Sequence, residues 1–109
     1  MPHYLIQGNY ASEGLKGLMK DKASGRKEAV SKAVGGLGGK VESIYYCFGK
    51  YDVIVIVEAP DNVSVAALAI AVSASGLVRI ETTTLLTVEE TDKAVAKAVD
   101  YRAPGKQSK

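Results

Sequence analysis

The sequence contains no tryptophan, one phenylalanine, one histidine and one cysteine. The single cysteine, Cys47, excludes an internal disulfide, which agrees with a reducing compartment. The single histidine, His3, leaves a transition-metal site short of ligands, because such a site needs about three side chains and no Cys/His spacing supplies them. Without tryptophan the core must be mainly aliphatic, and six tyrosines provide most of the aromatic surface. We therefore expect neither a metal nor another cofactor.

Long hydrophobic runs and a strong net charge are also absent. The longest apolar run, "VSVAALAIAVSA", is too short and too small in its side chains to span a bilayer. The opening "MPHYLIQGNY" lacks the basic segment and apolar run of a secretory signal. The net charge is +2, and we interpret the lysine-rich segments 12–40 and 93–109 as solvated helix faces. We expect a cytoplasmic protein that binds neither a membrane nor nucleic acid.

The length of 109 residues fits one compact domain, assigned to residues 1–100, and the polar tail 101–109 is expected to be disordered. The pattern predicts strands at 3–10, 40–48, 51–59 and 77–87, and helices over 12–37, between Pro60 and Gly76, and over 88–100. This order is β-α-β-β-α-β with an extra C-terminal helix. It predicts an α+β, ferredoxin-like fold with one four-stranded antiparallel sheet and helices on one face.

Four local signals refine this prediction. Ser12 is the expected N-cap of the first helix, and Ser24-Gly25 should end or kink that helix. Gly49-Lys50 has the length of a tight hairpin and suits a type II′ turn. Asp61 or Asn62 should cap the middle helix. The stretch "TVEE" from Thr87 is a capping-box pattern at the start of the last helix.

Two segments are more apolar than a small monomer requires. The unbroken β-branched run 53–57 indicates a strand that is covered on both faces. Residues 63–74 carry no charge, which is typical of a helix buried on more than one side. We therefore expect a homodimer or higher homo-oligomer. Two sheets packed face to face, as in a dimeric α/β barrel, would cover the second face of this strand.

Polar side chains gather on one predicted face of this sheet. Strand alternation puts His3, Gln7, Glu58, Arg79 and Glu81 on this face. Such a face either lines a cleft or pairs its charges across a subunit interface, and Arg79 should meet Glu58 or Glu81 because a buried charge needs a partner. The structural ion pair is the favoured reading. The candidate ligand-binding residues are His3, Tyr51, Asp52, Glu58, Arg79 and Glu81.

Several other features have an ordinary explanation that we prefer. Cys47 has no neighbour that would activate its thiol, so it is interpreted as a small buried hydrophobe. The glycines of "GGLGGK" follow a helix and lack P-loop spacing, so they predict no nucleotide site. Tyr45, Tyr46 and Tyr51 could line a pocket, but packing is the commoner role of strand tyrosines. Asp52 could belong to a site, although bracing the hairpin by accepting backbone N–H bonds is slightly preferred.

The spaced segments "EGLKGL", "GRKEAV", "GGKVESIYYCFGKYDVIVIVEAPDN" and "GLVRIETTTLLTVEE" resemble the GYD-domain family of small bacterial proteins. The Gly-x-Tyr-Asp motif of that family corresponds here to Gly49, Tyr51 and Asp52. The resemblance covers about residues 3–92 and implies a dimeric α/β-barrel fold. It implies no activity, because none is established for the family.

A more distant resemblance is to the effector-binding domain of leucine-responsive regulators, which bind amino acids between subunits. The chain has no preceding helix-turn-helix, so direct transcriptional control is not expected. Our first hypothesis is a homo-oligomeric binding module that holds a small polar ligand at a subunit interface. The alternatives are a small cofactor-poor enzyme of the dimeric α/β-barrel type, an isomerase or monooxygenase using His3, Asp52 or Glu58, and a purely structural oligomer. We favour the binding module over the enzyme.

Overall fold

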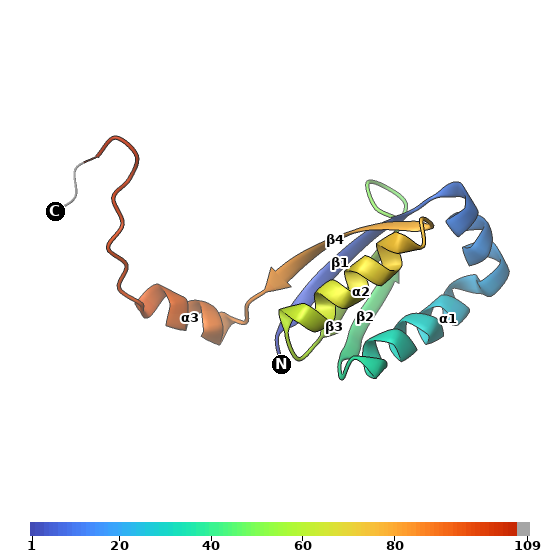
Figure 1. Ribbon diagram of the computed structural model, residues 1–109, viewed down its shortest axis with the longest axis horizontal. Coiled ribbons are helices and arrows are strands. Elements are labelled where there is room, and N and C mark those ends of the chain that lie inside the picture. The colour runs from blue at the N-terminus through green and yellow to red at the C-terminus, as the bar shows by residue number, and fades with distance from the viewer. Residues whose placement is uncertain (107–109) are drawn as a thin grey trace.

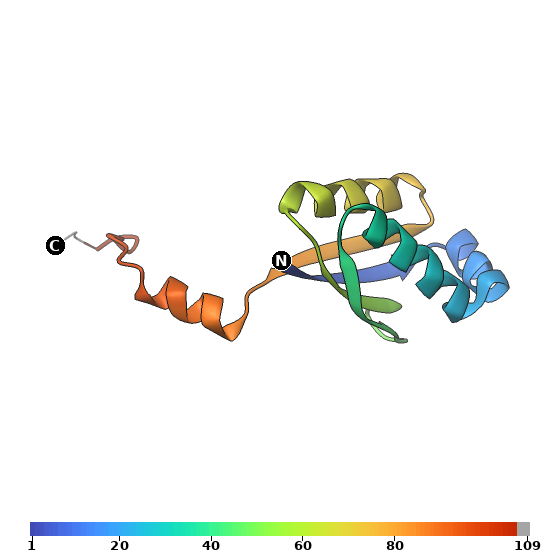
Figure 2. The same ribbon diagram turned by 90° about the horizontal axis from the view of Figure 1, so that it is seen from below.

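The chain forms one four-stranded antiparallel sheet with two helices on one of its faces. The computed structural model describes residues 1–106. Its elements are β1 (His3–Tyr10), α1 (Ser12–Gly36), β2 (Lys40–Tyr46), β3 (Val53–Glu58), α2 (Asn62–Ala74), β4 (Val78–Leu85) and α3 (Val88–Ala96). The strand order is β2-β3-β1-β4, and α1 and α2 lie on the same side of the sheet (Figures 1 and 2). The predicted ferredoxin-like fold with an additional C-terminal helix is confirmed.

The hydrophobic core lies between the sheet and these two helices. It consists of alternate side chains of β1 and β3 together with residues of the helices and of the loop after β3: Tyr4, Ile6, Val53, Val55, Val57, Ala59, Val34 and Val65. The Tyr4 hydroxyl donates a 2.6 Å hydrogen bond to Asn62 Oδ1, which ties the start of α2 to the central strand. The opposite face of the same strands carries no helix, so we call it the bare face.

Helix α1 begins and bends at places other than those predicted. Its N-cap is Ala11, and no side chain caps it, so Ser12 already lies within the helix. The break falls at Lys22, whose φ of 64° is a left-handed value that is rare outside glycine. Gly25 does not form the break but allows the helix to pack closely after it. A Cβ at this position would lie 3.3 Å from Asp21 Cβ, so the missing side chain allows the close approach after the break.

The connection between β2 and β3 is longer than the predicted two-residue turn. It spans residues 47–52 and is closed by a 2.8 Å hydrogen bond from Cys47 N–H to the Asp52 carbonyl. Gly49 is not among the glycines with positive φ, which excludes a type II′ turn with Gly49 at its first central position. The prediction failed because the strands stop pairing at Tyr46 and Val53, which leaves six residues to connect.

The caps of the later helices agree with the sequence. Asp61 accepts a 2.8 Å hydrogen bond from Ser64 N–H, and Thr87 and Glu90 form both bonds of a capping box. Helix α3 ends at Ala96, a turn earlier than predicted, and extends away from the sheet at the end of β4 (Figure 1). In residues 1–106 no helix has the length and apolar character to cross a membrane. The division into domain 1–100 and a disordered tail stays a prediction, and part of that tail, 107–109, lies outside the described residues.

Candidate functional site

The bare face of the sheet carries most of the candidate residues and has an aliphatic centre. Leu5, Ile54 and Ile56 lie there half-buried, one position out of phase with the core residues of the same strands. Ladder pairing separates the polar residues into two groups at opposite ends. His3 pairs with Glu58 across β1 and β3, whereas Asn9, six residues along β1, pairs with Arg79 of β4. At about 3.3 Å per residue the two ends are roughly 20 Å apart.

One end is organised around Tyr51. The Tyr51 hydroxyl donates a 2.8 Å hydrogen bond to Glu81 Oε1, and Lys50 Nζ lies 5.5 Å from the centre of the Tyr51 ring. The bond to the Glu81 carboxylate is the main reason that the pKa of Tyr51 is raised. Gln7 is the ladder partner of Glu81 in β1. A phenol, a carboxylate, an amide and the nearby Arg79 guanidinium therefore share one end of the bare face.

Asp52 belongs to this end but its carboxylate faces the backbone. Its Oδ2 accepts a 2.8 Å hydrogen bond from Tyr10 N–H, and its own N–H donates a 2.8 Å bond to the Gly8 carbonyl. Asp52 thereby fastens the 47–52 loop to the end of β1. It accepts a backbone N–H as predicted, but from β1 and not from within the hairpin. Cys47 joins the same loop, because its thiol donates to the Tyr51 carbonyl at 3.1 Å.

The other end contains His3 and Glu58. The nearest acid to the imidazole is Glu42, whose Oε2 lies 3.1 Å from His3 Nδ1. The predicted pairing of Arg79 with Glu58 or Glu81 is not found, since none of the ion pairs within residues 1–106 includes Arg79. Arg79 is exposed at the sheet surface, so its charge is solvated and needs no partner within one chain. No cluster of three or more His, Cys, Asp or Glu side chains in the described chain could hold a metal ion.

The sequence reasoning missed a second polar group on the covered face. Tyr10, Arg26 and Tyr46 line a cavity between the sheet and the helices. Packing is the role that the sequence predicts for Tyr46, and the sequence pattern predicts no site at Tyr10 or Arg26. Strand alternation is the signal that could have found the tyrosines, because it puts Tyr46 on the face opposite Tyr45 and Tyr10 on the face of Tyr4 and Ile6.

The fold and the bare face define a ferredoxin-like α+β domain with a partly apolar sheet surface and a polar cluster at one end. A comparison with known families agrees with this class. Residues 4–95 match the family described as GYD domain. Since the match covers most of the 109 residues, the chain belongs to the GYD domain family. No curated protein matches the sequence.

Proposed function

We propose that the protein is a homo-oligomeric binding module in which two bare faces meet and hold a small polar ligand beside Tyr51. The observation that carries this proposal is the bare face itself, where the half-buried Leu5, Ile54 and Ile56 adjoin the hydrogen-bonded pair Tyr51–Glu81. A monomer gains nothing from aliphatic side chains in the middle of a solvated sheet, whereas sheets packed face to face about 10 Å apart would bury them.

The polar end of this face indicates the chemistry of the ligand. Arg79 and Glu81 lie two residues apart on β4 and therefore point to the same side of the sheet. Arg79 offers N–H donors and Glu81 offers acceptor oxygens, so the best match is a molecule that carries both an anionic and a donor group. Tyr51 lies against Glu81 and would close the site from the 47–52 loop.

Two further surfaces support an assembly of more than one chain. Helix α2 exposes Val63 and Ile70, which are 79% and 69% accessible. Helix α3 exposes Val88 and Val95 in the same way. Apolar helix surfaces of this kind are typical of protein interfaces. They agree with a homo-oligomer of at least two copies, for which we propose a cytoplasmic location.

The enzyme alternative has weaker support. The Asp52 carboxylate already accepts the Tyr10 N–H, and His3 and Glu58 lie at the other end of the sheet. Within one chain these three groups do not converge on a point where a substrate could exchange a proton. A binding module needs no such convergence.

Light scattering on the full chain at micromolar concentration, followed by thermal-shift screening, tests the proposal. We expect a dimer or larger species, and we expect Ile56→Asp on the bare face to yield a folded monomer. Zwitterionic metabolites such as amino acids should raise the melting temperature, and Tyr51→Phe and Glu81→Gln should weaken that effect. Lys20→Gln, an exposed change on α1, is the control and should alter neither property.

A monomeric wild type would overturn the proposal. An oligomer whose melting temperature no zwitterion raises would leave the structural alternative, and turnover of a ligand would favour the enzyme. Each of these results contradicts a different part of the proposal.

A further inference from the structure

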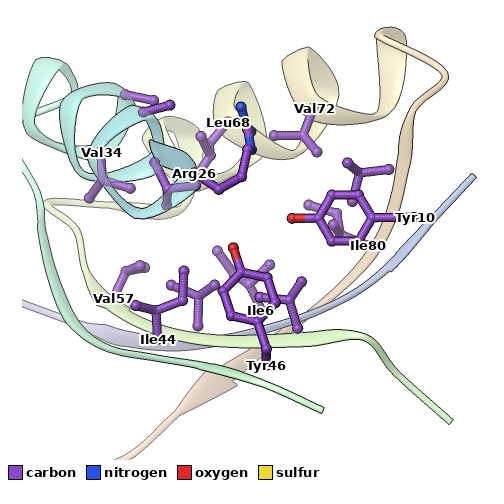
Figure 3. A pocket seen from close by; sticks show the side chains of 16 residues that line it. Ile6, Tyr10, Arg26, Val34, Ile44, Tyr46, Val57, Leu68, Val72 and Ile80 are labelled. Carbon is purple, nitrogen blue, oxygen red and sulfur yellow. The ribbon is translucent and has the colours of Figure 1, made fainter. Parts of the chain in front are cut away.

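A cavity of about 130 Å³ lies on the covered face, between the sheet and both helices. Figure 3 shows its lining, which is aliphatic except for a few polar groups. The main contacts of α1 are with β2 and β1, and those of α2 are with β4, so the two helices leave space between them above the middle of the sheet. The site is separate from the one proposed above, because it lies on the other side of the same strands.

Three polar groups enter this cavity, and all of them are hydrogen-bond donors. Arg26 comes from α1, Tyr10 from the end of β1 and Tyr46 from the end of β2. The tyrosine hydroxyls point into the space between sheet and helices, and the Arg26 side chain crosses the upper part of that space with its nitrogens directed toward the helices (Figure 3). Burial and the neighbouring Tyr10 hydroxyl raise the pKa of Tyr46 to about 12, so its phenol keeps its proton at neutral pH.

Of these groups, the Tyr46 hydroxyl gives the strongest indication that a ligand binds in the cavity. Its oxygen is inaccessible to solvent and forms no hydrogen bond of good geometry with any atom of residues 1–106, although the Tyr10 hydroxyl lies close enough to contribute to its raised pKa. Buried polar atoms in folded proteins nearly always have a partner, so an unpaired hydroxyl beside a cavity indicates a group that is absent from the free chain. Arg26 has donors available for a ligand. Its side chain is 32% exposed, its ion-pair partner in residues 1–106 is Asp21 at 3.8 Å, and a guanidinium has five N–H donors.

We propose that this cavity binds a small monocarboxylic acid with an aliphatic or single-ring body, whose carboxylate accepts hydrogen bonds from Arg26, Tyr10 and Tyr46. The lining includes no acidic side chain, and the Asp21 carboxylate paired with Arg26 lies 3.8 Å away, beyond hydrogen-bond distance, so an anionic group in the cavity can compete for the Arg26 donors. The apolar body packs against side chains such as Val34, Leu68 and Val72. An engineered cavity of similar size, about 150 Å³, holds benzene, which sets the size of that body.

The same argument predicts selectivity against amino acids. An ammonium group beside the carboxylate needs acceptors, and the lining has no carboxylate to offer; its side-chain acceptors are the neutral hydroxyl oxygens of Tyr10 and Tyr46, which are weaker partners for a buried cation. A deaminated acid should therefore bind better than the amino acid with the same side chain. 4-Methylpentanoate and leucine differ only in this ammonium group, and 4-methylpentanamide removes the negative charge from the same carbon skeleton. The three compounds form a matched series.

Titration of the full-length protein with this series, followed by calorimetry and by methyl NMR, tests the proposal. We expect 4-methylpentanoate to bind with a dissociation constant between about 1 µM and 1 mM, a range set by its small size. It should shift the methyl signals of Val34, Leu68 and Val72 and leave those of Ile54 and Ile56 unchanged. At these cavity methyl groups, leucine and the amide should each bind at least tenfold more weakly, since a charge-assisted hydrogen bond is lost or a buried ammonium is unpaired.

Paired variants identify the groups that hold the carboxylate. Arg26→Gln should weaken binding of 4-methylpentanoate about tenfold or more, and Lys32→Gln, an exposed change on the same helix, should not. Tyr46→Phe should weaken it several-fold, while Tyr45→Phe on the other face of β2 should have no effect. The tyrosine pair also keeps the test decisive if Arg26→Gln does not fold.

Three results would overturn the proposal: no methyl shift with 4-methylpentanoate, equally strong shifts of the Val34, Leu68 and Val72 methyl signals by leucine or the amide, or unchanged binding by both Arg26→Gln and Tyr46→Phe. Its fate is independent of the interface site. The monomeric Ile56→Asp variant should still bind 4-methylpentanoate, because Ile56 lies on the bare face. A protein that binds the acid but stays monomeric would confirm this cavity and refute the dimer.

Discussion

The two faces of the sheet are built from the same strands but have opposite surroundings. On the covered face Val53, Val55 and Val57 are almost completely buried, and Val57 is only 1% accessible. Ile54 and Ile56 alternate with them and remain partly exposed on the bare face. The β-branched run therefore combines two sets of side chains. One set is buried by the helices of its own chain, and the other has no cover within that chain.

This difference explains how one strand can serve two purposes. A strand that only closed a core would alternate apolar with polar residues, since its outer side would face water. Here the outer positions are as apolar as the inner ones, which is the pattern of a strand covered on both sides. The fold of one chain accounts for half of the pattern, and the proposed oligomer accounts for the other half.

Neighbouring substitutions in β3 give the largest expected contrast between the faces. Val57→Ala removes buried methyl groups and should lower the free energy of unfolding by about 2–3 kcal/mol at every protein concentration. Ile56→Ala should cost less within one chain, about 1 kcal/mol, but because it weakens association the midpoint should depend less steeply on concentration than in the wild type, and the loss relative to wild type should be larger at the higher concentration. Urea unfolding at 1 µM and 100 µM protein, roughly, measures both effects. Equal, concentration-independent losses would mean that the bare face is not an interface.

Substitutions of the adjacent residues Tyr51 and Asp52 should likewise differ in their effect on the free energy of unfolding. Asp52→Ala removes the acceptor of the Tyr10 N–H and should lower the free energy of unfolding by about 1–2 kcal/mol. Tyr51→Phe removes an exposed bond to Glu81 and should change it by less than about 0.5 kcal/mol. Chemical denaturation of both variants checks this. If Tyr51→Phe costs more than Asp52→Ala, the stabilising part of the motif is misassigned.

The order of elements could be predicted because each element has its own local signal. The helix caps at Asp61 and Thr87 and the apolar run of β3 depend on neighbouring residues, and the structure has them where the sequence indicates. The break in α1 and the 47–52 connection were misplaced. Both depend on where strands and helices stop contacting distant parts of the chain, and a local pattern does not contain that information.

The candidate site was harder to predict for the same reason. Alternation correctly sorted residues between the faces, but it could not reveal that His3 and Tyr51 lie at opposite ends, since that depends on ladder register. It also gave no reason to join Arg26 to Tyr10 and Tyr46, which come from three separate elements. Asp52 connects the two faces in a way that only the structure shows. Its carboxylate holds the backbone of Tyr10, whose side chain lines the inner cavity.

The smallest expected effect is on the pH dependence of stability, where Tyr46 on the covered face should differ from Tyr45 on the bare face. Tyr46 has its folded-state pKa raised from 10.0 to about 12. Between these pH values the unfolded chain loses this proton while the folded chain keeps it, so the free energy of unfolding should fall as pH rises from 10 to 12. Tyr46→Phe should reduce that slope. Near neutral pH it should be neutral or stabilising by up to about 1 kcal/mol, because the hydroxyl it removes is buried without a partner.

Tyr45→Phe is the matched control, since its side chain is 69% accessible and no buried hydroxyl is removed. Denaturation curves at neutral pH and at several values from pH 9 to 12, roughly, distinguish the two tyrosines. If Tyr46→Phe keeps the wild-type slope, or loses more than about 1 kcal/mol at neutral pH, then its hydroxyl has a partner in the free protein. In that case the covered face would be complete in the single chain. The proposed ligand site in the inner cavity would then lose its main support, and only the proposed interface on the bare face would remain.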